Sequence, residues 1–486
     1  MNYTEMAVFI VYLVFMMGIG VYFFFRSKGG GEKEYFLGGR QMGAWVSALS
    51  AGASDMSAWV LMGLPASIYA MGIGQAWIAI GLAIGYTISW LFQAPRLRRF
   101  SIKAGDSITI PQYLTNRFLS KSNALQILCA VIFLVAYTVY AASSIKACGT
   151  LFNTVMNIDA NVAMYIAAFV IIAYTFLGGF SAVCWTDFFQ GLLMLAALLV
   201  APIFALALIN SSSFVAPAAA AMPDGYFNLF TSWQDVLSGL GWGLGYFGMP
   251  HIIVRFMSLR SEKDLRKSSA IGITWTVIIV IMSVLSGVVG RLFLGEISDS
   301  STVFITLVRT IFPALISGIL LSAILAAAMS TADSQLLASA SAFANDVYKP
   351  VFRKNASDKE MLWAGRIIVV IIAVVALLIA SNPNSGTIMG LVENAWGVFG
   401  AAFGPAIMLS LFWKRLNFAG AIAGIAVGAI VDIAWLAFLS STGIYEIIPG
   451  FILGLIAAVV VSMVTPAPSK EVEELFDEAA KPEVES

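Results

Sequence analysis

Runs of about twenty apolar residues recur from one end of this chain to the other. Each run is long enough to cross the hydrocarbon core of a bilayer, about 30 Å thick, as a helix. Of the 486 residues, 60% are hydrophobic and only 11% are charged, which leaves too little polar surface for a soluble domain. We therefore expect an all-α membrane protein with about thirteen transmembrane helices.

The distribution of Lys and Arg tests this count, because these residues should gather in every second loop. Nearly all of the 27 do so, on the side that the positive-inside rule assigns to the cytoplasm. The pattern predicts a multi-pass protein of the bacterial cytoplasmic membrane, with its amino terminus outside and its carboxyl terminus in the cytoplasm. The expected spans are 5–25, 43–72, 74–95, 123–152, 161–178, 180–209, 233–257, 270–294, 312–346, 361–381, 386–412, 417–440 and 447–465.

The segments between the spans are too short for a soluble domain. They contain no Gly-rich phosphate loop, and the three cysteines and the single histidine match no metal-binding pattern. Equal numbers of basic and acidic residues, 27 each, give no reason to expect a nucleic-acid partner. We expect no enzymatic activity, no cofactor, no transition metal and no obligatory protein partner. The Pro- and Glu-rich residues 467–486 are predicted to form a disordered cytoplasmic tail.

Three spans contain residues that a helix in lipid avoids. The second carries SAGASDMS at 50–57, the seventh GWGLGYFGMPH at 241–251, and the ninth STADS at 330–334. Unpaired backbone groups are costly in hydrocarbon, so such segments are tolerated only where a cavity or a ligand satisfies them. We predict interrupted helices whose freed carbonyls face a hard cation and whose amide ends face an anionic substrate group.

The second and seventh spans lie five apart, which predicts two inverted five-helix units. The first unit covers 43–230, with spans two to six. The second covers 231–440, with spans seven to eleven and span twelve. Residues 1–42 hold the first helix and a cytoplasmic loop, and 441–466 hold the last helix.

Acidic residues inside a membrane are expensive and mark candidate functional sites. Asp55 lies in the interrupted second span and is the leading candidate. For Asp187, a structural hydrogen bond and a role in ion binding are equally favoured. For Asp333, only the neighbouring residues, and not the direction of its side chain, support an ion site. Glu393 and Asp432 are lone acids in later spans, which we interpret as helix-packing hydrogen bonds.

Three long motifs identify a family resemblance. They are SAGASDMSAWVLMGLP at 50–65, GWGLGYFGMPH at 241–251 and SAILAAAMSTADSQL at 322–336. With FLGGR at 36–40, WTD at 185–187 and YEIIPGF at 445–451, they resemble the sodium/solute symporter family, and within it the bacterial sodium/proline symporters. The resemblance runs almost end to end. It implies a leucine-transporter-like fold, with a five-plus-five inverted repeat, that works by alternating access.

The resemblance implies a sodium site made of backbone carbonyls and hydroxyl groups. The carbonyls are those of Ala53, Met56 and Ala327, and the hydroxyls those of Ser330 and Thr331. Ala327, Ser330 and Thr331 stand at i, i+3 and i+4, so one helix face offers three oxygens. A hard monovalent cation prefers such neutral oxygen ligands.

The resemblance also makes Asp55 and Ser57 important for sodium coupling. A candidate second cation site is formed by Asp187 with Ser330, Asp333 and Ser334. The proline carriers of the family have a neutral hydroxyl residue where Asp333 stands, so the number of sodium ions is left open.

The transported solute implied by the resemblance is L-proline. Its pocket is implied to consist of Trp59, Tyr140, Trp242 and Tyr246, with Ser57 and the backbone near Pro250 as polar or shaping contacts. Flat aromatic walls suit the apolar pyrrolidine ring.

Two alternatives stay open. A sodium symporter for another small solute, such as pantothenate, a sugar acid or another amino acid, would keep the sodium residues and change the aromatic wall. A proton-coupled carrier would depend on titration of Asp55, Asp187 or Asp333.

Overall fold

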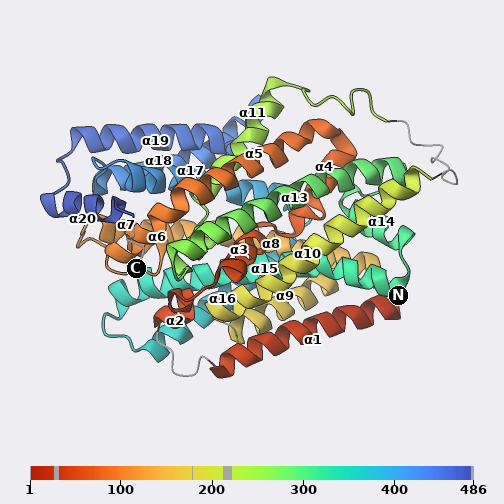
Figure 1. Cartoon of the computed structure of the whole chain (residues 1–486), viewed down its shortest axis with the longest axis horizontal. Coiled ribbons are helices and arrows are strands. Elements are labelled where there is room, and N and C mark those ends of the chain that lie inside the picture. Colours follow the sequence, from red (N-terminus) through yellow and green to blue (C-terminus); the bar gives the residue numbers. More distant parts are fainter. Residues whose placement is uncertain (1, 27–31, 178, 212–221, 483–486) are drawn as a thin grey trace.

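The computed structural model describes residues 2–26, 32–177, 179–211 and 222–482, and these residues form a bundle of helices. Most helices run along the long axis of the molecule (Figure 1). The only strand-like feature within the described ranges is an isolated bridge between Met42 and Leu259.

The first half of the chain forms ten α-helices. They are α1 (Tyr3–Arg26), α2 (Glu32–Leu37), α3 (Ala44–Asp55), α4 (Gly63–Met71), α5 (Ala76–Ile88), α6 (Ala94–Lys103), α7 (Ile110–Arg117), α8 (Ala124–Met156), α9 (Ala160–Leu177) and α10 (Phe180–Ile209).

The second half forms ten more. They are α11 (Trp233–Gly241), α12 (Pro250–Ser258), α13 (Glu262–Leu294), α14 (Val303–Ile311), α15 (Ala314–Ala342), α16 (Asp358–Ser381), α17 (Ile388–Phe412), α18 (Phe418–Phe438), α19 (Ile447–Val464) and α20 (Lys470–Ala480).

Short 3-10 or π segments join several of these helices. They are η1 (Gly38–Arg40), η2 (Ala58–Val60), η3 (Ile73–Gln75), η4 (Ser89–Gln93), η5 (Trp242–Phe247), η6 (Ser300–Thr302), η7 (Phe343–Phe352) and η8 (Ser440–Thr442).

The predicted multi-pass membrane architecture is confirmed. In the described part of the chain, ten helical stretches are long and apolar enough to cross a membrane. They match ten of the thirteen predicted spans. The other three correspond to α3 with α4, to α9, and to α11 with α12. The exact number of crossings stays a prediction.

The second predicted span is interrupted where the motif SAGASDMS predicts it. Helix α3 ends at Asp55, and Met56 leaves helical geometry with φ −79° and ψ 72°. The hydroxyl of Ser57 then accepts a hydrogen bond from the amide of Trp59 and caps the 3-10 turn η2. Helix α4 resumes at Gly63, so the freed backbone groups lie in the middle of the span.

The seventh predicted span is interrupted by its glycines. Helix α11 passes into the 3-10 segment η5, and Met249 is extended before α12 begins at Pro250. Proline suits the first turn of a helix because it has no amide hydrogen to leave unpaired. Gly85 of α5 and Gly243 of η5 pack backbone to backbone, since a Cβ on Gly85 would lie 2.2 Å from the Gly243 carbonyl oxygen.

The prediction of an interrupted ninth span was wrong. Helix α15 is continuous through 330–334 and continues into the π-helical segment η7. The stretch STADS contains no Gly or Pro, and Ser and Thr hydroxyls can bond to carbonyls of the preceding turn without breaking a helix. This helix therefore offers side-chain oxygens to the site. Its carbonyls stay bonded within the helix, although a Ser or Thr hydroxyl can share a carbonyl of the preceding turn.

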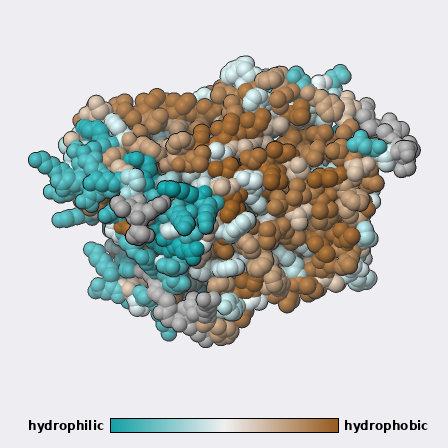
Figure 2. Space-filling model, viewed as in Figure 1, coloured by the Kyte–Doolittle hydropathy of each residue, from teal (hydrophilic) through white to brown (hydrophobic). Residues whose placement is uncertain are grey.

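The interrupted helix α3 packs against α10, α12, α13 and α15, and η5 packs against α5 and α17. The two interruptions are thereby enclosed in the middle of the bundle. Hydrophobic residues cover most of the face shown in Figure 2, and hydrophilic residues gather at one end, around α20 and α7.

The predicted disorder of residues 467–486 was wrong for most of that segment. Ser469 caps the helix α20, which lies against α6 and α7. Its buried positions Val472, Phe476 and Ala479 follow the helical period. Only three apolar positions mark this pattern in a segment dominated by Glu, so the composition concealed the amphipathic helix.

Phe476 anchors α20. Its ring packs edge-on against Phe100 of α6, with centroids 5.3 Å apart, and the Arg117 guanidinium lies 4.9 Å from its centroid. At the rim of this contact, Lys414 pairs with Asp477 at 2.7 Å. The exposed ion pair contributes little, so the buried aromatic ring is the main attachment.

We expect Phe476→Ala to release α20 from the bundle. The loss of a buried phenyl ring costs about 3 kcal/mol, mostly in the docking of this helix. A Glu-specific protease should then cleave α20 much faster in the purified Phe476→Ala variant than in the purified parent protein. Glu474→Ala, at an exposed position of the same helix, is the control and should cleave no faster. Equal cleavage of Phe476→Ala and the parent chain would contradict this role.

Candidate functional site

The end of α3 and the middle of α15 bring most of the predicted sodium ligands together. The Ser330 hydroxyl lies 2.8 Å from the carbonyl oxygen of Ala53 and 3.2 Å from that of Ala327. All three residues are fully buried. Two carbonyl oxygens and a hydroxyl oxygen therefore converge from two helices at the interruption of α3.

Thr331 adds a polar atom without a partner. Its Oγ1 is buried and makes no hydrogen bond, although a buried hydroxyl normally finds one. Met56, the next predicted ligand, occupies the non-helical position after α3 and is also fully buried. The donor set is neutral and oxygen-only, which fits an alkali cation and does not fit a soft transition metal.

Asp55 joins the two interrupted helices. Its Oδ2 accepts a 2.6 Å hydrogen bond from the hydroxyl of Tyr246 in η5, and its Oδ1 is buried without a partner. Its backbone carbonyl lies 3.4 Å from the indole nitrogen of Trp59. Asp55 thus fixes the position of the unwound segment next to the converging oxygens.

The predicted aromatic residues form a continuous buried group. The centroid of Trp242 lies 6.4 Å from that of Trp59, and Tyr140 and Tyr246 are fully buried nearby in the same core. The hydroxyl of Tyr140 has no hydrogen-bond partner. Flat rings with an unsatisfied hydroxyl can receive a small molecule that is apolar on one side and polar on the other.

Sequence reasoning missed Trp396 and Tyr445, which complete this aromatic group. The indole nitrogen of Trp396 donates a 2.8 Å hydrogen bond to the carbonyl of Trp242, and the Tyr445 ring lies 5.1 Å from the Trp242 ring. A Cβ on Gly245 would meet the Trp396 indole at 2.0 Å, so this glycine is required by the close approach. Tyr445 opens the motif YEIIPGF at 445–451, which could have singled it out, whereas no local sequence signal distinguishes Trp396 from core residues.

An arginine side chain contacts two members of the predicted second cation site, Asp187 and Ser334. Arg255 of α12 is buried, and its guanidinium lies 3.2 Å from a carboxylate oxygen of Asp187 and 2.6 Å from the hydroxyl of Ser334. The hydroxyl of Ser50 donates a 2.6 Å hydrogen bond to the same carboxylate. Sequence analysis did not predict that Arg255 lies beside Asp187.

The other members of that predicted set divide into two groups. Ser334 contacts Arg255 and also lies 3.3 Å from Asp333, whereas Ser330 turns toward Ala53. The structure therefore places Ser330 with the α3 oxygens rather than with Asp187. Within the described ranges, no group of three or more His, Cys, Asp or Glu residues suited to hold a metal ion occurs.

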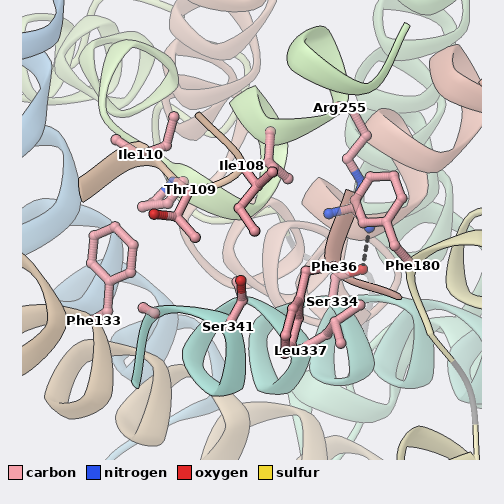
Figure 3. Close-up of a pocket in the computed structure, with 14 residues that line it drawn as sticks. Phe36, Ile108, Thr109, Ile110, Phe133, Phe180, Arg255, Ser334, Leu337 and Ser341 are labelled. Atoms are coloured by element: carbon pink, nitrogen blue, oxygen red, sulfur yellow. Dashed lines mark hydrogen bonds between the residues drawn. The ribbon is translucent and has the colours of Figure 1, made fainter. Parts of the chain in front are cut away.

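A cavity lies beside Arg255 on the α2 and α7 side of the bundle (Figure 3). Arg255 and Ser334 meet at one end of it, and Thr109 faces Ser341 across it. Pro250 also lines this cavity, so the predicted substrate contact at Pro250 lies on its wall.

Two further hollows approach the aromatic group from the other end of the bundle. Both are lined by Gln75, Ile78, Trp242 and Glu393, together with loop residues between α13 and α14, α16 and α17, or α18 and α19. The aromatic group and the α3 oxygens are buried between these hollows and the cavity in Figure 3.

Comparison with solved structures places the fold. The chain matches a Na+-coupled sialic acid symporter in a substrate-bound outward-open state, with a TM-score of 0.79, 21% identity, and coverage of 96% of this chain and 99% of the other. It also matches MhsT in complex with L-phenylalanine, with a TM-score of 0.56, 14% identity and coverage of 87% and 98%. The predicted leucine-transporter-like fold is confirmed.

Comparison with curated sequences gives close relatives over nearly the whole chain. The high-affinity proline transporter PutP of Bacillus subtilis is 43% identical, over 95% of this chain and 98% of its own length. The osmoregulated proline transporter OpuE of the same organism is 44% identical, over 96% of each chain. A sodium/proline symporter of Staphylococcus aureus is 42% identical, over 97% of this chain and 95% of its own length.

The model of the Sodium:solute symporter family matches residues 35–428. This range includes both interrupted spans and α15. The chain therefore belongs to the sodium:solute symporter family.

Proposed function

We propose that this protein takes up L-proline together with sodium by alternating access. The observation that carries the proposal is the convergence of Ala53, Ala327, Ser330 and the unpartnered Thr331 hydroxyl beside a buried aromatic group. The names of the relatives support the choice of proline and sodium.

The sodium ion would displace the hydrogen bond from Ser330 to Ala53 and use the freed oxygens as ligands. Thr331 Oγ1 and the carbonyl of Met56 would complete the set. Because two ligands belong to α3 and three to α15, binding holds these helices together. Loss of the ion would let them separate, which links occupancy to opening.

The solute would lie against Trp59, Tyr140, Trp242 and Tyr246. Proline is a zwitterion with a small apolar ring, so the rings suit the pyrrolidine, and Ser57 with the unwound backbone suits the charged groups. Pro250 would border the route to the cavity shown in Figure 3.

Asp55 would act as a positioning residue rather than as a ligand. Its hydrogen bond to Tyr246 ties the sodium side of the interruption to the aromatic side. A shift of one interrupted segment on binding either sodium or proline is thereby transmitted to the other. Ser57 lies two residues further and caps the turn that carries Trp59.

The pairing of Asp187 with Arg255 favours a stoichiometry of one sodium ion per proline. Asp187 and Ser334 already hold the Arg255 guanidinium, so they have no need of a second ion. One ion moving inward across about 100 mV releases about 2.3 kcal/mol, and a tenfold sodium gradient adds about 1.4 kcal/mol. Together these terms sustain a solute gradient of several hundred-fold.

The membrane assignment extends this proposal. The protein would lie in the bacterial cytoplasmic membrane with its amino terminus outside and α20 in the cytoplasm, as the Lys and Arg distribution predicts. The two units, 43–230 and 231–440, would move against each other around the sodium and proline sites.

Transport by the purified protein in proteoliposomes tests the proposal. We expect an inward sodium gradient to raise the initial rate of labelled proline uptake at least tenfold, with one sodium ion entering per proline. Equal rates with and without the gradient would contradict sodium coupling, and uptake driven by a pH gradient without sodium would favour the proton-coupled alternative. If pantothenate, a sugar acid or another amino acid inhibits the uptake of labelled proline more strongly than unlabelled proline does, that compound and not proline is the transported solute.

We expect Ser330→Ala and Thr331→Ala to raise the sodium concentration for half-maximal uptake about tenfold each. Each change removes one oxygen ligand, and a tenfold change corresponds to about 1.4 kcal/mol. The measurement is the sodium dependence of proline uptake at saturating proline. Ser322→Ala is the matched control on α15, because its hydroxyl bonds only to the carbonyl of Gly318 in its own helix. An unchanged sodium dependence in both variants would remove these residues from the site.

We expect Tyr246→Phe to weaken the binding of sodium and proline together. The change removes the one hydrogen bond that the buried Asp55 carboxylate makes to a described side chain, which costs about 1–3 kcal/mol. Half-saturation constants for both solutes should rise at least fivefold. Tyr86→Phe is the control, since the Tyr86 hydroxyl is buried in the same place but has no hydrogen-bond partner. A rise in only one constant would refute the coupling role of Asp55.

A further inference from the structure

Three acidic residues lie on the segments where α17, α18 and α19 pack together. Glu393 lies on α17, Asp432 on α18, and Glu446 directly before α19. These helices pack closely against one another and lie side by side in Figure 1. None of the three acids belongs to the proposed sodium or proline sites.

The backbone of Gly397 shows how closely two of these side chains approach. A Cβ at Gly397 would lie 2.8 Å from Oδ1 of Asp432 and 3.4 Å from Cγ of Glu446. Gly397 is one helical turn after Glu393 on the same face of α17. A side chain at this position would collide with Asp432, so the glycine lets both acids lie against the same stretch of α17.

The oxygens in this space have no partners. Asp432 is fully buried, and neither of its carboxyl oxygens makes a hydrogen bond. Glu446 is 6% exposed, and its Oε1 is also unpartnered. The interpretation of Asp432 as a helix-packing hydrogen bond was therefore wrong.

No basic side chain compensates these acids. The hollow beside them, lined by Asp235, Glu393 and Glu446, contains no Lys, Arg or His among its lining residues. The adjoining hollow is lined by Lys146, whose ammonium group bonds to Ser385 and Gly386. The local charge is uncompensated in the part of the chain that the structure describes.

Two ionised carboxylates at this junction without a cation are unfavourable. Ionised carboxylates buried without a counter-charge carry a large desolvation cost, and two that lie close together also repel each other. A bound cation reduces the negative charge and occupies the unpartnered oxygens. A proton shared between the two acids is the competing arrangement, and the experiments below distinguish it from a cation.

We propose that Asp432 and Glu446 bind a sodium ion at a site separate from the α3–α15 site, with backbone and water oxygens as further ligands. Two carboxylates and neutral oxygens form a hard, oxygen-only donor set suited to this ion. Glu393 lies at the mouth, where the acidic hollow attracts cations. Tyr445 lies between this site and the rest of the aromatic group, since its hydroxyl donates a hydrogen bond to the Glu393 carbonyl and its ring centroid lies 5.1 Å from that of Trp242.

Equilibrium binding of radioactive sodium to the purified full-length protein tests this site. We expect two ions per chain in the parent protein, one in the Ser330→Ala/Thr331→Ala double variant, and one in Asp432→Asn. Combining all three changes should abolish binding. Glu446→Gln is a second variant that should also lose one ion, and Asp224→Asn, an exposed acid in a loop, should lose none.

The outcomes separate this site from the proposed transport function. Loss of one ion in Asp432→Asn with an unchanged ratio of sodium to proline in uptake supports a site that is not transported. Full retention of two ions in both Asp432→Asn and Glu446→Gln overturns the proposal, and so does a single ion in the parent protein. An infrared band of a protonated carboxyl that disappears in Asp432→Asn would also overturn it, by assigning a proton in place of the cation. If the Ser330→Ala/Thr331→Ala double variant still binds two ions per chain, the proposed sodium site at Ser330 and Thr331 is wrong, and the Asp432 site is unaffected.

Discussion

The hydrogen bond between Asp55 and Tyr246 is the contact on which the site depends. It joins the interruption of α3 to the interruption between α11 and α12, two segments 191 residues apart in sequence. Each interruption alone would expose unpaired backbone groups in an apolar environment. Brought together, they satisfy part of each other's polar requirement, and the same end of α3 that carries Asp55 also meets Ser330 through the carbonyl of Ala53.

Charge compensation explains how the bundle tolerates its buried acids. Asp187 is paired with Arg255, a cation carried on the half-helix α12, whereas Asp432 and Glu446 have no basic partner. A fixed guanidinium makes the first site independent of ions in solution. No such group accompanies the second pair among the described residues, and this contrast is the basis for proposing different roles for acids that look alike in sequence.

Interruptions and continuous helices differ by their glycines and prolines. The second and seventh spans break at segments with Gly or Pro close by, and the structure agrees with the prediction there. The ninth span was expected to break at Ser330–Ser334 but stays helical, because hydroxyl side chains can bond within the helix. Helix α20 escaped prediction because three apolar residues among glutamates gave too weak a signal.

The sequence by itself determined the membrane class, the position of most spans, the two interruptions and the family, because apolar run length and glycine-rich motifs are local properties of a chain. Only the tertiary structure decided which acids have partners. Arg255 meets Asp187, and Asp432 and Glu446 both approach Gly397, through contacts between different helices. Such contacts depend on how the helices rotate and pack, and neither spacing nor composition records that.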